Sequence, residues 1–115
     1  MHIKIFTSQV PKQDLLQLAK DSYGDMVKGV VDIRTQTIAL GGELHADAEE
    51  ILLDQGSKQE DLWGFNIYPA KSKDEYVEYT SLINIRPRQG NMDREIKDPE
   101  LRTQIKAILD AKVLL

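Results

Sequence analysis

The stretch from Gly41 to Glu49, which reads GGELHADAE, holds the densest group of side chains able to do acid–base or metal chemistry. His45 is central, because an imidazole exchanges protons near neutral pH and binds divalent metal ions. His45 and Glu49 are four residues apart, so a helix through this stretch places them on one face. We expect Glu43 from the glycine turn and Asp32 from a neighbouring strand to join them.

Two interpretations of this first polar cluster are open. In the functional one, His45, Glu43 and Asp32 act as general acid and base, and His45 with Glu49 binds a metal ion. The second histidine of the H-E-x-x-H signature is missing, which argues against a zinc protease. In the structural one, Asp47 and Glu49 stabilise the N-terminus of a helix, and His45 lies at the edge of the core.

A second polar cluster spans two predicted strands and the loop that follows them. Asparagine is unfavourable in strands, so Asn66 in DLWGFNIYP and Asn84 in SLINIRP require a reason. The loop PRQGNMDREIK adds arginines around a glycine, where guanidinium groups and backbone N–H groups suit a carboxylate or phosphate. We therefore predict binding of an anionic small molecule by Asn66, Asn84, Arg86, Asn91 and Arg94.

The alternative for the second cluster is purely structural. Acidic residues are frequent in the same part of the chain, and local charge is nearly balanced. The arginines would then pair with carboxylates and attach the loop to the domain. The candidate partners of Arg86 are Glu78, Asp93, Glu95 and Asp98.

Hydrophobic periodicity predicts the elements that position the first cluster. Ile3 to Phe6 alternates like a half-buried strand, and an apolar stripe predicts a helix from Pro11 to about Ser22. Met26 to Leu40 is rich in Val, Ile and Thr and predicts two paired strands, with residues 34–36 between them. A second helix is predicted from Leu44 to Gln55.

The second half of the chain predicts a hairpin and a final helix. Leu62 to Tyr68 and Tyr76 to Arg86 read as antiparallel strands, and residues 87–97 read as a loop. Asp98 and Pro99 have the types expected at an N-cap and a first helical position. The order is βαββαββα, which predicts one α+β domain over residues 1–115, with a mostly antiparallel sheet covered by three helices.

Alternation along the strands assigns side chains to faces of the sheet. In the strand after Met26, Lys28 and Asp32 lie on the more polar face. In the strand that begins at Leu62, Trp63 and Phe65 point to one face of the sheet and Asn66 points to the other. We predict that both aromatic residues belong to the core.

Composition narrows the class of protein. The 115 residues include 41% hydrophobic and 30% charged residues, which is typical of a globular chain. No apolar run approaches the roughly 20 residues of a membrane span, and no signal peptide is recognisable. Cysteine is absent, so we expect a cytoplasmic protein without disulfides. A net charge of −4 argues against a nucleic-acid partner.

The blocks GGELHADAE, DLWGFNIYP and SLINIRPRQGN, in this order, span nearly the whole chain. Together they resemble an uncharacterised bacterial family of short single-domain proteins that is known only as a domain of unknown function. The resemblance implies a stand-alone bacterial domain. It implies no activity, cofactor or catalytic residue.

Two functional hypotheses remain. The first is a small-molecule or anion-binding protein, or a small hydrolase-like enzyme, and it requires both polar clusters to meet on one face of the sheet. The second is a non-catalytic interaction module or homodimer, in which a sheet edge or the apolar tail KVLL docks a partner. The sequence names no cofactor.

Overall fold

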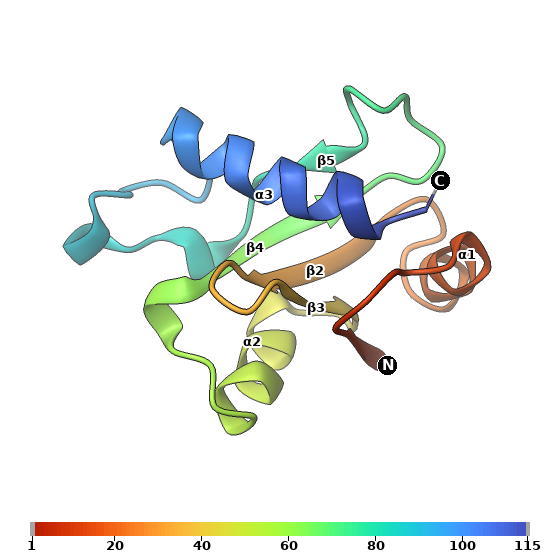
Figure 1. The fold of residues 1–115 in the computed structure, drawn as a ribbon, viewed down its shortest axis with the longest axis horizontal. Coiled ribbons are helices and arrows are strands. Elements are labelled where there is room, and N and C mark those ends of the chain that lie inside the picture. The colour runs from red at the N-terminus through yellow and green to blue at the C-terminus, as the bar shows by residue number, and fades with distance from the viewer. Residues whose placement is uncertain (1, 115) are drawn as a thin grey trace.

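The computed structural model describes residues 2–114 and shows a five-stranded antiparallel sheet in the order β1-β3-β2-β4-β5 (Figure 1). The chain order confirms the predicted α+β class and the sequence βαββαββα. The elements are β1 (Ile3–Phe6), α1 (Lys12–Asp21), β2 (Val27–Asp32), β3 (Thr37–Gly41), α2 (His45–Asp54), β4 (Leu62–Ile67), β5 (Val77–Glu78) and α3 (Pro99–Lys112).

The centre of the sheet is the long pairing of β2 with β4. Its register runs from Val27 opposite Ile67 to Asp32 opposite Leu62. Gly29 lies opposite Phe65, and a Cβ at Gly29 would come within 2.4 Å of the phenylalanine ring. The glycine therefore makes room for an aromatic side chain in the core.

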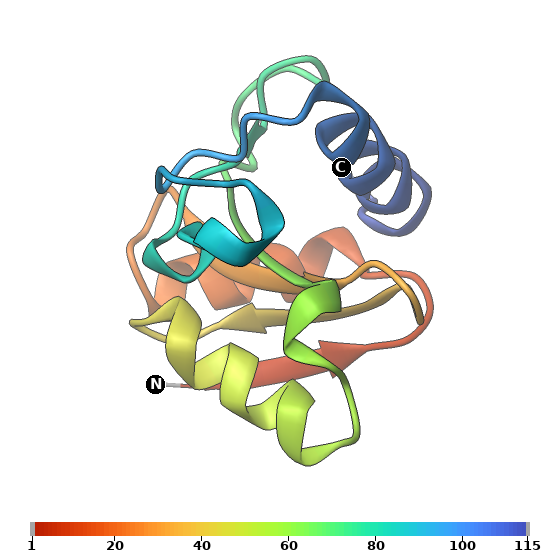
Figure 2. The same ribbon diagram turned by 90° about the vertical axis from the view of Figure 1, so that its left-hand side faces the viewer.

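The helices cover both faces of the sheet, with α2 on one side and α3 on the other (Figure 2). On the α2 side, Val30 of β2 packs with Leu52 in the smaller apolar cluster. On the opposite side, Trp63 and Phe65 are buried in the larger cluster with Ile105 of α3 and residues of α1, which confirms their predicted place in the core. The even-numbered residues of β2 and β4 therefore face α2.

The N-termini of α2 and α3 are capped in different ways. α3 starts as predicted, because the Asp98 carboxylate accepts a hydrogen bond from the N–H of Glu100 at 2.9 Å and Pro99 is the first helical residue. α2 starts after Leu44, whose side chain cannot cap it. The first N–H groups of α2 therefore lack a side-chain acceptor at the N-cap.

The prediction of a strand from Tyr76 to Arg86 is wrong over most of that range. Only β5 pairs with β4, through Glu78 opposite Asn66 and Val77 opposite Ile67. The chain then leaves the sheet through short 3₁₀ helices at Leu82–Asn84 and Pro87–Gln89.

Gly64 and Asn84 explain this departure. A Cβ at Gly64 would lie 2.6 Å from the Cβ of Ser81, so the absence of a side chain lets the departing segment pack directly on β4. The Asn84 amide then substitutes for the missing strand. Its Oδ1 accepts from the Gly64 N–H at 2.8 Å, and its Nδ2 donates to the Gly64 carbonyl at 3.0 Å.

The C-terminal tail packs on its own domain. Val113 is buried and forms a parallel bridge with Val10, and the N–H of Leu114 donates to the Val10 carbonyl at 3.1 Å. Leu115, the last residue of the tail that we considered for docking, lies outside the described residues. Within residues 2–114, no helix combines the length and the apolar composition needed to cross a membrane.

Candidate functional site

A pocket of about 390 Å³ opens on the α2 side of the sheet. Residues 44–46 at the N-terminus of α2 form one wall, and residues 80–83, after β5, form the opposite wall. Lys28 of β2, Asn66 of β4 and Arg94 from the loop before α3 complete the lining. The volume lies within the range of small-molecule sites.

His45 is held in one orientation at the edge of this pocket. It is 8% exposed, and its Nε2 lies 2.8 Å from the carbonyl oxygen of Phe65. A carbonyl only accepts, so Nε2 carries a proton and donates it. In the neutral ring, Nδ1 is then the unprotonated nitrogen, and the side chain of Asn66 is a further hydrogen-bonding group beside the ring.

The surroundings of His45 favour the neutral imidazole. Burial lowers its pKa below the ordinary value, and the charge of Lys28 acts in the same direction. The Phe65 carbonyl, the Asn66 side chain and the charge of Glu78 oppose this shift without reversing it. At neutral pH, His45 is therefore an uncharged group with a lone pair on Nδ1.

Asn66 contributes a second acceptor. Its Nδ2 donates to Glu78 Oε1 at 2.7 Å and to the carbonyl oxygen of Thr80 at 3.2 Å. These two acceptors determine the orientation of the amide, because a flipped amide would place its oxygen against them. The residue is 6% exposed, and its Oδ1 is buried without a hydrogen-bond partner among the described residues. An unpaired buried carbonyl costs stability unless a donor reaches it.

The pocket is electropositive around these acceptors. Lys28 and Arg94 line it, and Glu78 is the acidic side chain that accepts a hydrogen bond from Asn66. The N-terminus of α2 adds the partial positive charge of its backbone N–H groups. No ion pair within residues 2–114 engages Lys28 or Arg94. An anion would therefore be attracted to this part of the surface.

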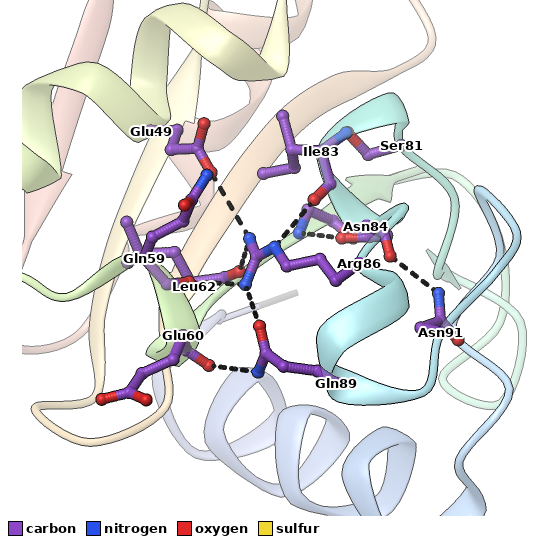
Figure 3. Close-up of polar contacts among 11 residues, drawn as sticks. Glu49, Gln59, Glu60, Leu62, Ser81, Ile83, Asn84, Arg86, Gln89 and Asn91 are labelled. Carbon is purple, nitrogen blue, oxygen red and sulfur yellow. Dashed lines mark hydrogen bonds and ion pairs between the residues drawn. The ribbon is translucent and has the colours of Figure 1, made fainter.

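Arg86 lies beside the pocket, at the centre of a buried network (Figure 3). Its guanidinium is 4.7 Å from the ring centroid of Trp63. Burial lowers its pKa, and the charge of Glu49, 3.4 Å away, opposes that shift. Each guanidinium N–H has an acceptor, so none remains for a ligand. The acceptors are the side chains of Glu49 and Gln89 and the carbonyls of Gln59, Leu62 and Ile83.

Asn84 and Asn91 are engaged in a similar way. Asn84, fully buried, uses its amide on Gly64 and on the carbonyl of Arg94. Asn91 Nδ2 donates to the Asn84 carbonyl at 2.8 Å, and its Oδ1 accepts from the N–H of Lys97 at 3.1 Å. Of the ligand-binding residues predicted from the sequence, only Asn66 and Arg94 therefore line the pocket.

The structure separates the acidic residues expected around His45. Asp32 lies at the opposite end of α2, where it accepts from Ser57 Oγ at 2.6 Å. A ten-residue helix is roughly 15 Å long, so Asp32 does not reach His45. The side chain of Glu43 is exposed and lies outside the pocket.

Asp32 instead stabilises the turn between β2 and β3. Its Oδ1 accepts from the N–H groups of Arg34 and Thr35 at 2.9 and 3.1 Å. Burial raises the pKa of Asp32, but the hydrogen bonds from Ser57, Thr35 and Arg34 outweigh this effect and leave the pKa below its ordinary value.

His45 and Glu49, predicted as metal ligands, are occupied separately. His45 bonds the Phe65 carbonyl, and Glu49 pairs with Arg86. Within residues 2–114, no group of three or more His, Asp or Glu side chains is placed to hold a metal ion. The pair nevertheless connects the two polar clusters, because one turn of α2 separates the pocket from the Arg86 network.

Sequence reasoning missed Lys28 and the uncapped start of α2 as parts of the site. A signal for Lys28 was present, since alternation along its strand places it on the more polar face. The signal for the helix was a leucine at position 44, where Ser, Thr, Asp or Asn would cap the helix.

Fold and site together define a small α+β domain with an electropositive pocket at the start of a helix. Residues 4–112 match the family described as protein of unknown function (DUF5674), and the chain belongs to that family. Neither a curated protein nor a solved structure matches the chain.

Proposed function

We propose that this domain binds a small organic anion in the pocket between the start of α2 and the segment after β5. The observation that carries the proposal is the meeting of Lys28, Arg94 and the uncapped helix N-terminus around one pocket of about 390 Å³. Helix N-termini and cationic side chains both favour anions. Arg86 has the supporting role of holding the wall of the pocket through its buried hydrogen bonds.

Binding is better supported than hydrolysis. A hydrolase built on His45 requires a partner that orients the ring or activates water, and the carboxylates predicted for this role, Asp32 and Glu43, lie outside the pocket. A cytoplasmic location and a bacterial origin remain predictions.

The test is an NMR titration with propionate and with propyl phosphate as probes. We expect saturable shifts at the backbone amides of His45 and Ala46 and at the side-chain amide of Asn66. Affinity should fall as salt rises, because the cations are partly exposed. A millimolar interaction saturates well below roughly 50 mM ligand. If neither probe shows saturable binding up to that concentration, the proposal is refuted.

The double variant Lys28→Gln/Arg94→Gln locates the binding site. Each cation contributes up to about 1 kcal/mol to the free energy of anion binding, so the double variant should bind propyl phosphate roughly tenfold more weakly. The matched control is Lys58→Gln/Arg88→Gln, which removes the same charge from exposed positions outside the pocket. An equal loss of affinity in both variants would mean that net charge alone attracts the anion.

An interaction module is the second candidate. Its support is a pair of exposed apolar side chains at the same pocket, Leu44 at 57% and Leu82 at 70% exposure, with Ile85 and Met92 exposed further along the chain. Patches of this kind commonly bind other proteins. Size-exclusion chromatography with light scattering tests self-association, and a monomer at high micromolar concentration would argue against a homodimer.

A further inference from the structure

On the basis of the proposed function, we infer that the ligand is amphipathic, with an anionic head beside Lys28 and Arg94 and an apolar tail along Leu44 and Leu82. All four residues line the same pocket. A small anion alone gives the two cations a role, but it leaves the apolar walls without one. The inference rests on the exposure and placement of those apolar walls.

Two leucines lie on opposite walls of the pocket without serving the core. Leu44 immediately precedes α2, and Leu82 begins the 3₁₀ helix that follows β5. Both are exposed, and neither belongs to the apolar clusters formed by residues 2–114. Leu44 also occupies an N-cap, where a polar side chain would stabilise the helix. Both leucines are therefore available to an apolar group of a ligand.

The apolar surface continues beyond the pocket. Leu82 and Ile83 line the pocket and also a second hollow of about 560 Å³, whose lining includes Ile85 and Pro87 beside polar side chains. Ile83 is half-buried and packs against the smaller apolar cluster, which fixes its position. A tail that leaves the pocket over Leu82 therefore meets further apolar side chains.

Charge complementarity selects an anionic head for this tail. Arg94 is exposed, and the Lys28 ammonium lies 5.2 Å from the ring centroid of Tyr23. Neither cation has an ion-pair partner within residues 2–114. A cationic head would be repelled by both groups, and an uncharged head would leave both unused. An anion with a hydrocarbon tail satisfies the cations and the leucines together.

The test is an NMR titration of the full chain with propyl phosphate, hexyl phosphate and hexylammonium. A fully buried methylene improves the dissociation constant roughly fourfold, so half burial in an open pocket gives about twofold. Three added methylenes should then make hexyl phosphate bind roughly eightfold more tightly than propyl phosphate. In Leu82→Gln this ratio should fall to about twofold. The matched control is Leu16→Gln, at an exposed leucine of α1 outside both hollows, and it should keep the wild-type ratio.

The outcomes separate this inference from the proposed function. Equal affinity of the two phosphates in the wild type, or an unchanged ratio in Leu82→Gln, would overturn the apolar tail and leave the anion pocket standing. If hexylammonium binds as tightly as hexyl phosphate, or if neither phosphate binds, the proposed function itself fails. Light scattering covers the remaining occupant. A wild-type dimer that Leu82→Gln converts to a monomer would mean that a second copy of the chain covers the leucines, and would overturn the inference.

Discussion

Replacing Asn84 by alanine tests the structural basis of the pocket wall. Asn84 is fully buried and bonds the N–H and the carbonyl of Gly64 and the carbonyl of Arg94. After the substitution, the Arg94 carbonyl still accepts from the N–H of Ser81 at 3.1 Å. Both backbone groups of Gly64 lose these partners.

The expected cost follows from those two backbone groups. A buried N–H or carbonyl without a partner costs about 1–3 kcal/mol, which gives about 2–6 kcal/mol for Gly64. Entry of water and relaxation of the segment after β5 reduce this cost, so we expect a loss of about 3 kcal/mol in the free energy of unfolding. For a domain of this size, that loss lowers the melting temperature by roughly 10–15 °C.

Urea denaturation of the wild type and of two variants measures this cost. Asn66→Ala is the matched control, because it removes the same atoms from a site where Nδ2 binds the side chain of exposed Glu78 and one carbonyl. We expect the control to lose about 1 kcal/mol in the free energy of unfolding. The slope of that free energy against urea concentration should be the same in all three proteins. A loss in Asn84→Ala no greater than in the control would refute the idea that Asn84 substitutes for a strand.

Three further perturbations test the surroundings of the pocket. Arg86→Met leaves the mostly buried Glu49 without its cation and should lower the free energy of unfolding by about 3–5 kcal/mol. Adding Glu49→Gln to the same chain should recover part of this loss in a double-mutant cycle. Because the pKa of His45 is lowered in the folded state, the unfolded chain takes up its proton first as pH falls below about 6.5. Wild-type stability should therefore fall more than that of His45→Gln between pH 7.5 and 5.5, and parallel curves would contradict this. Gly64→Ala places a Cβ 2.6 Å from the side chain of Ser81 and should lower the free energy of unfolding, measured by calorimetry, by about 1–3 kcal/mol. An unchanged stability would show that the segment after β5 moves freely away from β4.

The elements that were predicted correctly depend on interactions between near neighbours in the chain. Asp98 caps α3 through a residue two positions away, and the apolar stripes of the helices repeat within one turn. The alternation in Leu62–Ile67 likewise placed Trp63 and Phe65 in the core. Such patterns follow from backbone geometry, so they can be read without knowing which segments meet.

The segment after β5 could not be predicted in this way. Val77, Ile83 and Ile85 have the alternating spacing of a strand. The same residue types also fit a segment that turns away from the sheet. The turn depends on contacts with Gly64, which is far away in the sequence. A pattern of local hydrophobicity contains no information about such a partner.

The sequence by itself determined the α+β class, the helices, the four longer strands and the identity of the polar residues that matter. The tertiary structure alone decided how those polar residues are used. It placed Asp32 and His45 at opposite ends of α2, committed Arg86 to backbone carbonyls, and brought Lys28, Asn66 and Arg94 to one pocket. The physical reason is that a polar side chain satisfies whichever partner the fold brings within hydrogen-bonding distance, and those distances depend on packing between segments remote in the chain.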